Sequence, residues 1–327
     1  MRQIPLGPSG LTVPPIVLGA NVFGWTADEA TSFAVLDAAV EAGLNALDTA
    51  DVYSRWAPGH AGGESESVIG RWLSARPGMR ARIVLITKGG SDMGVDAQGL
   101  PASGLSARWL EQAIDASLAR LGVDCVDHYF AHRPDDSTPH AETLGAYDRM
   151  IKAGKIRSIG ASNFSPEQLR GALETADREG LPRYSSLQPE YNLVARDKLE
   201  GPLLDLCRAE GLGVIPYFGL ASGFLTGLYR SKEDVAAKPR RGRLEVHMNA
   251  AGLRALEALD DVAARHAAKP AHVALAWVAA QDGVTGPIAS ATSVAQVADL
   301  VAAAALELSA QDLADLDAAT QPAATTG

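Results

Sequence analysis

An acid, a phenol, an amine and an imidazole stand near the ends of apolar segments in the first half of this chain. Asp48 ends a short apolar segment, and Tyr53 follows it on the next loop. Lys88 and His132 end two later apolar segments. All four are side-chain types that serve in proton transfer. They can form one site only if the segments are neighbouring parallel strands, whose carboxyl ends meet at one rim of a barrel.

The elements that would position these groups alternate along the chain. Residues 2–13 indicate a hairpin with Gly-Pro-Ser-Gly as its turn. We expect strands at 16–19, 44–48, 83–87, 126–131, 156–160, 185–188, 212–216 and 286–289. Amphipathic helices are expected near 28–42, 64–75, 106–121, 139–153, 166–178, 199–210, 250–267, 270–281, 293–305 and 309–319. The pattern predicts an α/β fold, a (β/α)8 TIM barrel with an N-terminal β-hairpin and extra helices at the C-terminal end, formed by residues 1–327 as a single domain.

Residues that start and stop helices support this order. Ser106 is placed to cap one helix at its start, and Gly122 to end it. Ser165 and Ser309 occupy the same capping position before two later helices. Residues 227–247 form a long segment without periodicity that is rich in lysine and arginine. A loop of this length on a compact barrel is usually a lid or a binding loop.

The composition excludes several classes of protein. The 327 residues are 47% hydrophobic and 21% charged, which is typical of a globular domain with a large core. The formal net charge of −10 argues against nucleic acid and anionic membranes as general partners. Cys125 and Cys207 fit no metal spacing, and we expect reduced thiols and no metal site. We see no signal-like leader and no membrane-spanning stretch, so we expect a cytoplasmic protein.

Several motifs in the chain resemble those of the aldo-keto reductases, and the match covers almost the whole length. The run 48–53 matches D-T-A-x-x-Y, and 65–70 fits S-E-x-x-x-G. Later motifs, in the same order, are Thr87-Lys88 for T-K, 132–135 for H-x-P-D, 160–164 for G-x-S-N-F, and 188–192 for Q-x-x-Y-N. One such motif is weak evidence, but all of them at consistent spacing strongly indicate this family of nicotinamide-dependent barrel enzymes.

The resemblance implies carbonyl reduction by hydride transfer. Tyr53 would be the general acid, although a free tyrosine, with a pKa near ~10, donates its proton slowly. Lys88, itself held by Asp48, would stabilise the phenolate. His132 would orient the substrate oxygen, or relay a proton in the oxidative direction. The phenol and imidazole together would resemble an oxyanion site.

The resemblance also implies where the cofactor lies. Ser162, Asn163 and Gln188 match residues that bind the nicotinamide carboxamide, and Tyr217 matches the aromatic that stacks on its face. The pyrophosphate would be lined by Leu220, Ser222, Gly223 and Leu225. The adenosine end would be met by Ile288, Ser290, Ala291, Thr292, Gln296 and Asp299.

The choice between the two nicotinamide cofactors stays open in the sequence. Many members of the family carry a lysine or arginine near 290–296 that holds the 2′-phosphate of NADP, and this chain has none between Pro287 and Leu300. NADP is expected by analogy with the family, and NAD is the alternative. An arginine from 230–243, or the hydroxyls of Ser290 and Thr292, could hold the phosphate instead.

The substrate would be a small carbonyl compound held by loops at the barrel rim. The pocket candidates are Val22, Phe23, Trp25, Trp56, Arg133 and Phe218. The sequence names neither the substrate, which could be a sugar, an aldehyde, a ketosteroid or a quinone, nor the oligomeric state.

Two other readings stay open. The chain could be a cofactor-sensing regulatory subunit like the potassium-channel β subunits, which share the fold. It could also be a Schiff-base enzyme that uses Lys88, a reading that leaves Asp48 and Tyr53 unexplained.

Four further residues are assigned structural roles. His128 lies four residues before His132 on the same strand and is interpreted as a core histidine. Asp51, Asp127 and Asp135 are interpreted as structural carboxylates at loops and strand starts.

Overall fold

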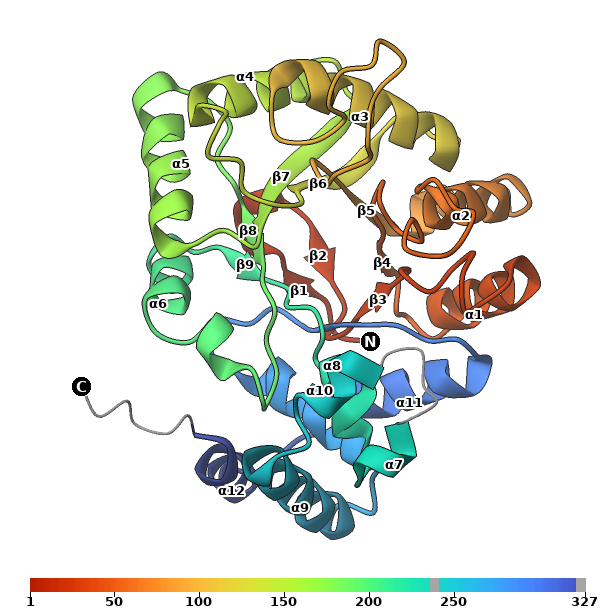
Figure 1. Cartoon of the computed structure of the whole chain (residues 1–327), viewed down its shortest axis with the longest axis vertical. Helices are drawn as coiled ribbons and strands as arrows, with labels where there is room; N and C mark the ends of the chain where they lie inside the picture. The colour runs from red at the N-terminus through yellow and green to blue at the C-terminus, as the bar shows by residue number, and fades with distance from the viewer. Residues whose placement is uncertain (236–240, 322–327) are drawn as a thin grey trace.

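The computed structural model describes residues 1–235 and 241–321. Its centre is a sheet of eight parallel strands in the order β10-β3-β4-β5-β6-β7-β8-β9 (Figure 1). The strands are β3 Val17–Gly19, β4 Ala46–Asp48, β5 Val84–Gly89, β6 Val126–Ala131, β7 Ile156–Ser162, β8 Ser186–Gln188, β9 Gly213–Val214 and β10 Ile288–Ala289. Backbone hydrogen bonds from Thr285 N to Val214 O and from Ile288 N to Pro216 O, both 2.7 Å, join the two ends of the sheet. The predicted TIM-barrel fold is confirmed.

Helices surround the strands, as the alternating pattern predicts (Figure 1). They are α1 Glu29–Glu41, α2 Glu64–Ser74, α3 Ala107–Leu121, α4 His140–Lys152, α5 Pro166–Glu179, α6 Pro202–Ala209, α7 Lys232–Val235, α8 Arg241–Glu245, α9 Ala250–Arg265, α10 Pro270–Ala280, α11 Val294–Ala305 and α12 Ala310–Thr320. Ser106, Ser165 and Ser309 accept backbone hydrogen bonds as N-caps, and Gly122 ends α3 in the left-handed conformation.

The N-terminal hairpin closes the amino end of the barrel. Strands β1 Ile4–Pro5 and β2 Thr12–Val13 pair antiparallel, and the turn between them contains a short 3-10 helix, Gly7–Ser9. A Cβ atom on Gly7 would lie 2.1 Å from Ser185 O, so only glycine allows this approach. The hairpin thus seals the bottom of the barrel with a small apolar cluster of its own residues and strand residues: Leu6, Val13, Val17, Ala46, Ile86, Phe130, Ile215 and Ile288.

The segment 227–247 differs in part from the prediction. It is not structureless, because it contains the two short helices α7 and α8. Residues 236–240, between them, lie outside the described part of the chain. Helix α8 packs on the 3-10 segment Ala221–Thr226, which follows β9. Whether 227–247 acts as a lid stays a prediction.

Among the described helices, none alone is long and apolar enough to cross a membrane, although α11 and α12 together reach the required length and composition across a bend of 110°. Cys125 and Cys207 are free thiols. Within the described residues no group of histidine, cysteine and acidic side chains could hold a metal ion.

Candidate active site

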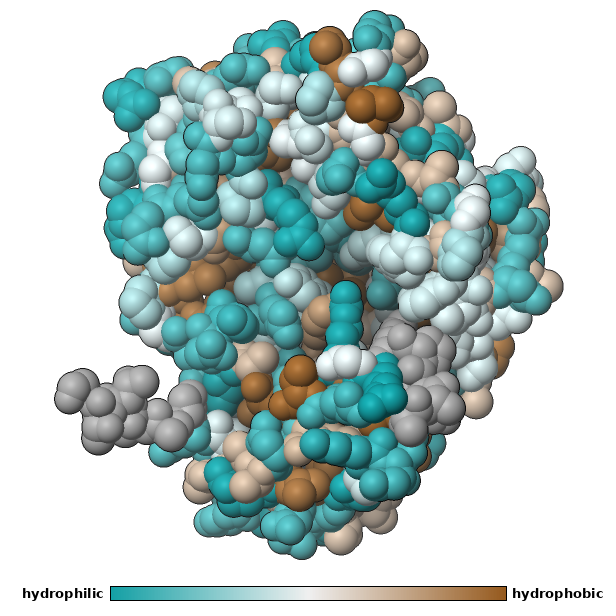
Figure 2. All heavy atoms as spheres, in the orientation of Figure 1, coloured by the Kyte–Doolittle hydropathy of each residue, from teal (hydrophilic) through white to brown (hydrophobic). Residues whose placement is uncertain are grey.

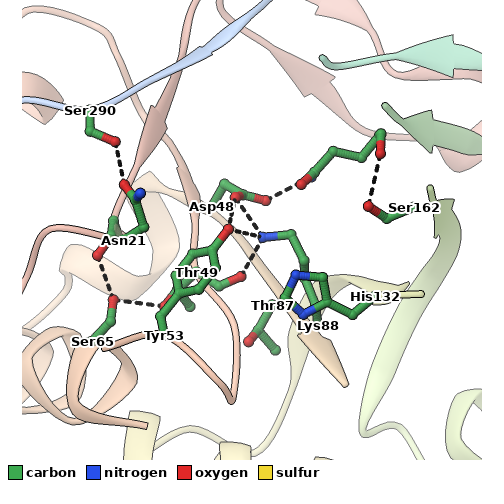
Figure 3. Close-up of polar contacts among 12 residues, drawn as sticks. Asn21, Asp48, Thr49, Tyr53, Ser65, Thr87, Lys88, His132, Ser162 and Ser290 are labelled. Atoms are coloured by element: carbon green, nitrogen blue, oxygen red, sulfur yellow. Dashed lines mark hydrogen bonds and ion pairs between the residues drawn. The ribbon is translucent and has the colours of Figure 1, made fainter. Parts of the chain in front are cut away.

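Lys88 is the centre of a hydrogen-bonded group at the carboxyl ends of the strands (Figure 3). Asp48 pairs in register with Ile86, so Lys88 lies two residues further along β5, beyond the end of β4. Its ammonium donates to Asp48 Oδ2 at 2.6 Å, to Thr49 O at 2.8 Å and to the Tyr53 hydroxyl at 2.8 Å. The fold therefore brings three of the four expected groups into direct contact.

Burial divides these groups into two pairs. Asp48 and Lys88 are 0% exposed, whereas Tyr53 and His132 are half-buried. The phenol and the imidazole are therefore the groups that a small molecule can reach, with the ion pair beneath them. Figure 2 shows a hollow near the centre of the face that carries α8, bordered largely by hydrophilic side chains.

The environment keeps the Tyr53 phenol protonated. Burial, followed by the carboxylate of Asp48, holds the pKa of Tyr53 well above its ordinary value. Burial also lowers the pKa of Lys88, although Asp48 opposes this shift. A protonated phenol is the form that a proton donor needs, and the ammonium 2.8 Å from its oxygen is placed to stabilise the phenolate once the proton has left.

His132 lies beside the phenol as a neutral imidazole. Its ring centroid is 6.0 Å from that of Tyr53, and its backbone N–H donates to Gly89 O at 2.9 Å. Burial, then the charges of Lys88 and Arg133, hold the pKa of His132 well below 6.5. Its Nδ1 atom is buried and has no hydrogen-bond partner among the described residues. A neutral imidazole at this place can donate a hydrogen bond to an oxygen without titrating near neutral pH.

The residues expected at the nicotinamide form one network with the ion pair. Gln188 Nε2 donates to Asp48 Oδ1 at 2.9 Å, and Ser162 Oγ donates to Gln188 O at 2.8 Å. Asn163 Nδ2 donates to His132 O at 3.0 Å. The carboxyl end of β8 thus contacts the Asp48 carboxylate directly, and the carboxyl end of β7 is joined to it through Gln188.

Tyr217 completes this network on the far side of the rim. Its hydroxyl donates to Asn163 Oδ1 at 2.6 Å. Asn163 holds a left-handed backbone conformation with φ 63°, which costs energy for a non-glycine residue. The side-chain amide of Asn163 is therefore positioned by a strained backbone conformation.

A second strained stretch follows Tyr217. Phe218, Ala221 and Ser222 have φ values of 58°, 46° and 60°, and Gly223 has 107°. Successive backbone N–H groups in such left-handed turns make concavities that attract anions. The stretch contains Leu220, Ser222 and Gly223, which were expected to line the pyrophosphate. The side chain of Leu225 is wholly buried in the core, so only its backbone could line that site.

The residues expected at the adenosine end lie on and after β10. Ser290 Oγ donates to Asn21 Oδ1 at 2.6 Å, and Ile288 is 8% exposed. Gln296 Oε1 accepts from Thr292 N at 2.7 Å.

The last residue of that set, Asp299, is tied to helix α10. It forms an ion pair with Lys269 at 2.6 Å and accepts from His272 at 3.1 Å. Lys269 is thus a basic residue that the tertiary structure brings to this end, where the sequence between Pro287 and Leu300 has none. Arg230, from the candidate loop, is engaged with Asp260 at 2.8 Å.

Of the substrate candidates, Trp56 lies beside the phenol, and two others lie beneath the rim. The rings of Trp25 and Trp56 meet at 5.6 Å, and Trp56, 48% exposed, lies 5.9 Å from the ring of Tyr53. Arg133 is exposed, and Phe218 stacks edge-on with Tyr217 at 4.9 Å. Phe23, by contrast, is wholly buried in the core, as Val22 almost is, so both lie beneath the rim and not on it.

Sequence reasoning did not find several contributors to the site. Thr49 supplies a backbone carbonyl to Lys88, which no side-chain pattern can reveal. Ser65 Oγ donates to Ala20 O at 2.7 Å and shares a hydrogen bond with Thr49 Oγ1 at 2.8 Å. Asn21 lies in none of the matched motifs. Ser65 and Thr49 stand within the matched motifs S-E-x-x-x-G and D-T-A-x-x-Y, which is the signal that could have found them.

His128 is a core histidine, as interpreted. It is 0% exposed, and its two ring nitrogens lie 2.7 Å from Ser158 Oγ and from Ser186 Oγ. Burial lowers its pKa to about 3. Both nitrogens are therefore occupied inside the barrel, away from the rim.

The fold is that of a barrel protein, and the comparison with known proteins defines its class as an oxidoreductase. The family model described as "Aldo/keto reductase family" matches residues 15–321, and the chain belongs to this family. An "Uncharacterized oxidoreductase YrpG" from Bacillus subtilis is 32% identical over 94% of this chain and 92% of its own length. "Aldo-keto reductase AMT2" from Alternaria alternata is 30% identical over 95% and 89%. A "Probable voltage-gated potassium channel subunit beta" from rice, Oryza sativa subsp. japonica, is 35% identical over 91% and 90%.

Proposed function

We propose that this oxidoreductase reduces an aldehyde or a ketone to the alcohol with NADPH, and oxidises the alcohol in reverse. The observation that carries the proposal is the ammonium of Lys88, which contacts both the buried Asp48 carboxylate and the accessible Tyr53 hydroxyl. This arrangement suits one task, the delivery of a proton from the phenol to an oxygen that gains negative charge.

Each of the four groups has a defined part. Tyr53 gives its proton to the substrate oxygen, and Lys88 stabilises the phenolate that remains. Asp48 keeps Lys88 charged and in place, since an unpaired ammonium in this buried position would tend to lose its proton. His132 directs its neutral imidazole at the same oxygen. The bound nicotinamide would supply the hydride.

The residues present fit a nicotinamide dinucleotide. Asn163 and Gln188 bring amide groups to the rim, and Tyr217 brings an aromatic face. The left-handed stretch 218–223 forms a backbone concavity for a pyrophosphate, although the N–H groups of Ala221 and Gly223 already donate to Phe218 O and Leu220 O. The proposal assigns Ser162, Asn163, Gln188 and Tyr217 to the nicotinamide end. It assigns Leu220, Ser222, Gly223 and the Leu225 backbone to the pyrophosphate, and Ile288, Ser290, Thr292, Gln296 and Asp299 to the adenosine.

NADP is the proposed cofactor because a cation is present at the adenosine end after all. Lys269 offsets the charge of Asp299, which would otherwise repel a 2′-phosphate. The lysine side chain is 64% exposed, so its remaining donors can meet a ligand. NAD would need no such cation, and Asp299 would accept a hydrogen bond from its ribose hydroxyl.

The substrate would be a small carbonyl compound bound between Trp25, Trp56, Arg133 and Phe218. The aromatic rings beside Tyr53 favour compounds with an apolar or aromatic body.

A regulatory role is the second candidate, favoured by the 35% identity to the rice protein named as a potassium-channel β subunit. This role requires slow turnover and tight cofactor binding, because the bound cofactor, and not the product of the reaction, would regulate the partner protein. Steady-state turnover far below the single-turnover rate would favour it.

Cofactor binding followed by a carbonyl assay tests the proposal. Quenching of tryptophan fluorescence by NADPH and then by NADH gives the two dissociation constants, and loss of NADPH absorbance with neutral aldehydes gives the activity. Binding of NADPH with turnover of at least one aldehyde supports the proposal. If neither cofactor binds, the nicotinamide assignments fail. Trapping of a carbonyl compound on Lys88 by borohydride would then favour the Schiff-base reading.

A further inference from the structure

Asp51 is a buried carboxyl group without a partner, two residues before Tyr53. It is 2% exposed, and neither carboxyl oxygen has a hydrogen-bond partner among the described residues. The two other carboxylates interpreted as structural behave differently. Asp127 accepts from Leu85 N at 2.8 Å and pairs with two arginines, and Asp135 accepts from Leu105 N at 2.8 Å and from neighbouring hydroxyls. Asp51 therefore does not have the contacts of a structural carboxylate.

The charged groups around Asp51 already neutralise one another. Glu66 on α2 accepts from Thr87 Oγ1 at 2.5 Å and pairs with Arg120 of α3 at 2.7 Å. Lys88 on β5 is paired with Asp48. With these two ion pairs complete, an ionised Asp51 would give the cluster an uncompensated negative charge.

Neighbours on β6 and on the loop itself do not relieve that charge. The hydroxyl of Tyr129 is buried and also lacks a hydrogen-bond partner among the described residues. The Asp51 backbone N–H donates to Lys88 O at 3.2 Å, which fixes the loop against β5 and does not engage the carboxyl group.

A buried carboxylate without a partner is costly, and such a group takes up a proton instead. Burial, then the charge of Glu66, raises the pKa of Asp51 to about 8, although Arg120, the backbone N–H of Val52 and Lys88 oppose the shift. Asp51 is thus a neutral acid at neutral pH and ionises in the mildly alkaline range.

The charge of Asp51 acts on both reacting partners above it. An ionised Asp51 raises the pKa of Tyr53 and that of Lys88. With Asp51 neutral, the ammonium of Lys88 is less compensated and stabilises the Tyr53 phenolate more strongly. Ionisation of Asp51 therefore makes the phenol a weaker acid.

We propose that Asp51 is a positioning residue for the reaction, which as a neutral acid keeps Tyr53 a competent proton donor and on ionisation slows carbonyl reduction. The inference rests on the proposed function, because it acts through Tyr53 and Lys88. It adds a fifth residue to Asp48, Tyr53, Lys88 and His132, and this residue sets the alkaline limit of the reductive reaction.

The test compares the wild-type chain with Asp51→Asn, which keeps the shape of the neutral acid and cannot ionise. Asp92→Asn is the matched control, since it removes one negative charge from an exposed residue near the same rim, 76% exposed at its side chain. We would measure kcat/KM for 4-nitrobenzaldehyde, which does not titrate, with saturating NADPH between about pH 6 and about pH 10. Infrared difference spectra over the same range follow the C=O stretch of a protonated carboxylic acid.

The expected result is a fall in wild-type kcat/KM centred near pH 8, by about tenfold if the pKa of Tyr53 moves by about one unit. Asp92→Asn should follow the wild type, and Asp51→Asn should lose this step together with the infrared band. Superimposable profiles for wild type and Asp51→Asn would overturn the proposal, as would a band that persists in the variant.

The infrared titration of the wild type alone decides the protonation state if Asp51→Asn does not fold. Failure to find a carboxylic acid that ionises near pH 8 would then overturn the proposal. If the chain reduces no carbonyl compound at all, the proposed function fails. The proposed effect of Asp51 on the rate of reduction then fails with it. The infrared band still reports whether Asp51 is neutral, so the two failures are distinguishable.

Discussion

The Nζ atom of Lys88 lies 2.8 Å from the hydroxyl oxygen of Tyr53, although 35 residues separate them in the chain. The same ammonium lies 4.5 Å from the centroid of the phenol ring. A cation so close to the phenol oxygen stabilises the phenolate, whereas burial keeps the free phenol protonated. In the proposed function, this contact is what makes an ordinary tyrosine usable as a proton donor.

Tyr53→Phe should leave cofactor binding within about twofold of wild type and lower kcat for carbonyl reduction by about 10²- to 10⁴-fold, because it removes only the donated proton. Fluorescence titration and steady-state kinetics measure the two effects. Tyr191→Phe is the control, since its hydroxyl donates to Glu200 and not to the rim. Near-normal turnover of Tyr53→Phe would remove Tyr53 from the mechanism.

Lys88→Met should lower the free energy of unfolding by about 3–5 kcal/mol, because it leaves the Asp48 carboxylate buried without its counter-ion. The double variant Asp48→Asn with Lys88→Met should recover part of this loss, since no buried charge remains. Urea unfolding curves measure both. A single variant within about 1 kcal/mol of wild type would show that the pair does not act as a buried ion pair.

Gly70→Ala should destabilise the fold, because a Cβ atom at this place in α2 would lie 2.1 Å from Arg120 O of α3. Overpacking of this kind costs about 1–3 kcal/mol. Gly145→Ala in α4 is the control. Its Cβ would meet only Arg149 Nη1 at 3.8 Å, so alanine should be neutral or stabilise by about 0.5–1 kcal/mol. The midpoint of thermal unfolding should therefore fall in Gly70→Ala and not in Gly145→Ala, and an equal fall in both variants would contradict the predicted clash at Gly70.

Lys269→Met should weaken NADPH binding by about tenfold, since a hydrogen bond to a charged group is worth about 1.5 kcal/mol or more. NADH binding should change little. Lys198→Met, which removes another exposed lysine, should alter neither constant. Equal weakening of NADPH binding and NADH binding would show that Lys269 does not distinguish the two cofactors.

The stability of the wild type should fall relative to Asp51→Asn as the pH rises. The unfolded Asp51 ionises near pH ~4, whereas the folded one does so at about 8. Between these values the folded chain holds a proton that the unfolded chain has lost, so the difference grows by up to about 1.4 kcal/mol per pH unit. Below pH ~4 and above pH ~8 the difference should be constant. Urea unfolding across this range measures it, and parallel stability profiles would contradict a neutral buried Asp51.

Much of the fold could be predicted from the residues because it depends on local patterns. Short apolar runs alternating with amphipathic stretches indicate a parallel barrel, and a serine before a helix satisfies backbone N–H groups wherever it occurs. The helices that begin after Ser106, Ser165 and Ser309 follow from this chemistry. The helices in 227–247 could not be predicted, because α7 and α8 are too short to show periodicity.

The sequence by itself determined the barrel and the identity of the groups at its rim, since strand ends and motif order are properties of the chain. Only the tertiary structure decided which of these groups meet and in what state. It placed Lys269 beside Asp299 from a separate helix, and it buried Phe23 below the rim. It also left Asp51 without a partner. Charge and solvation depend on neighbours from distant segments, and those neighbours exist only once the chain has closed around them.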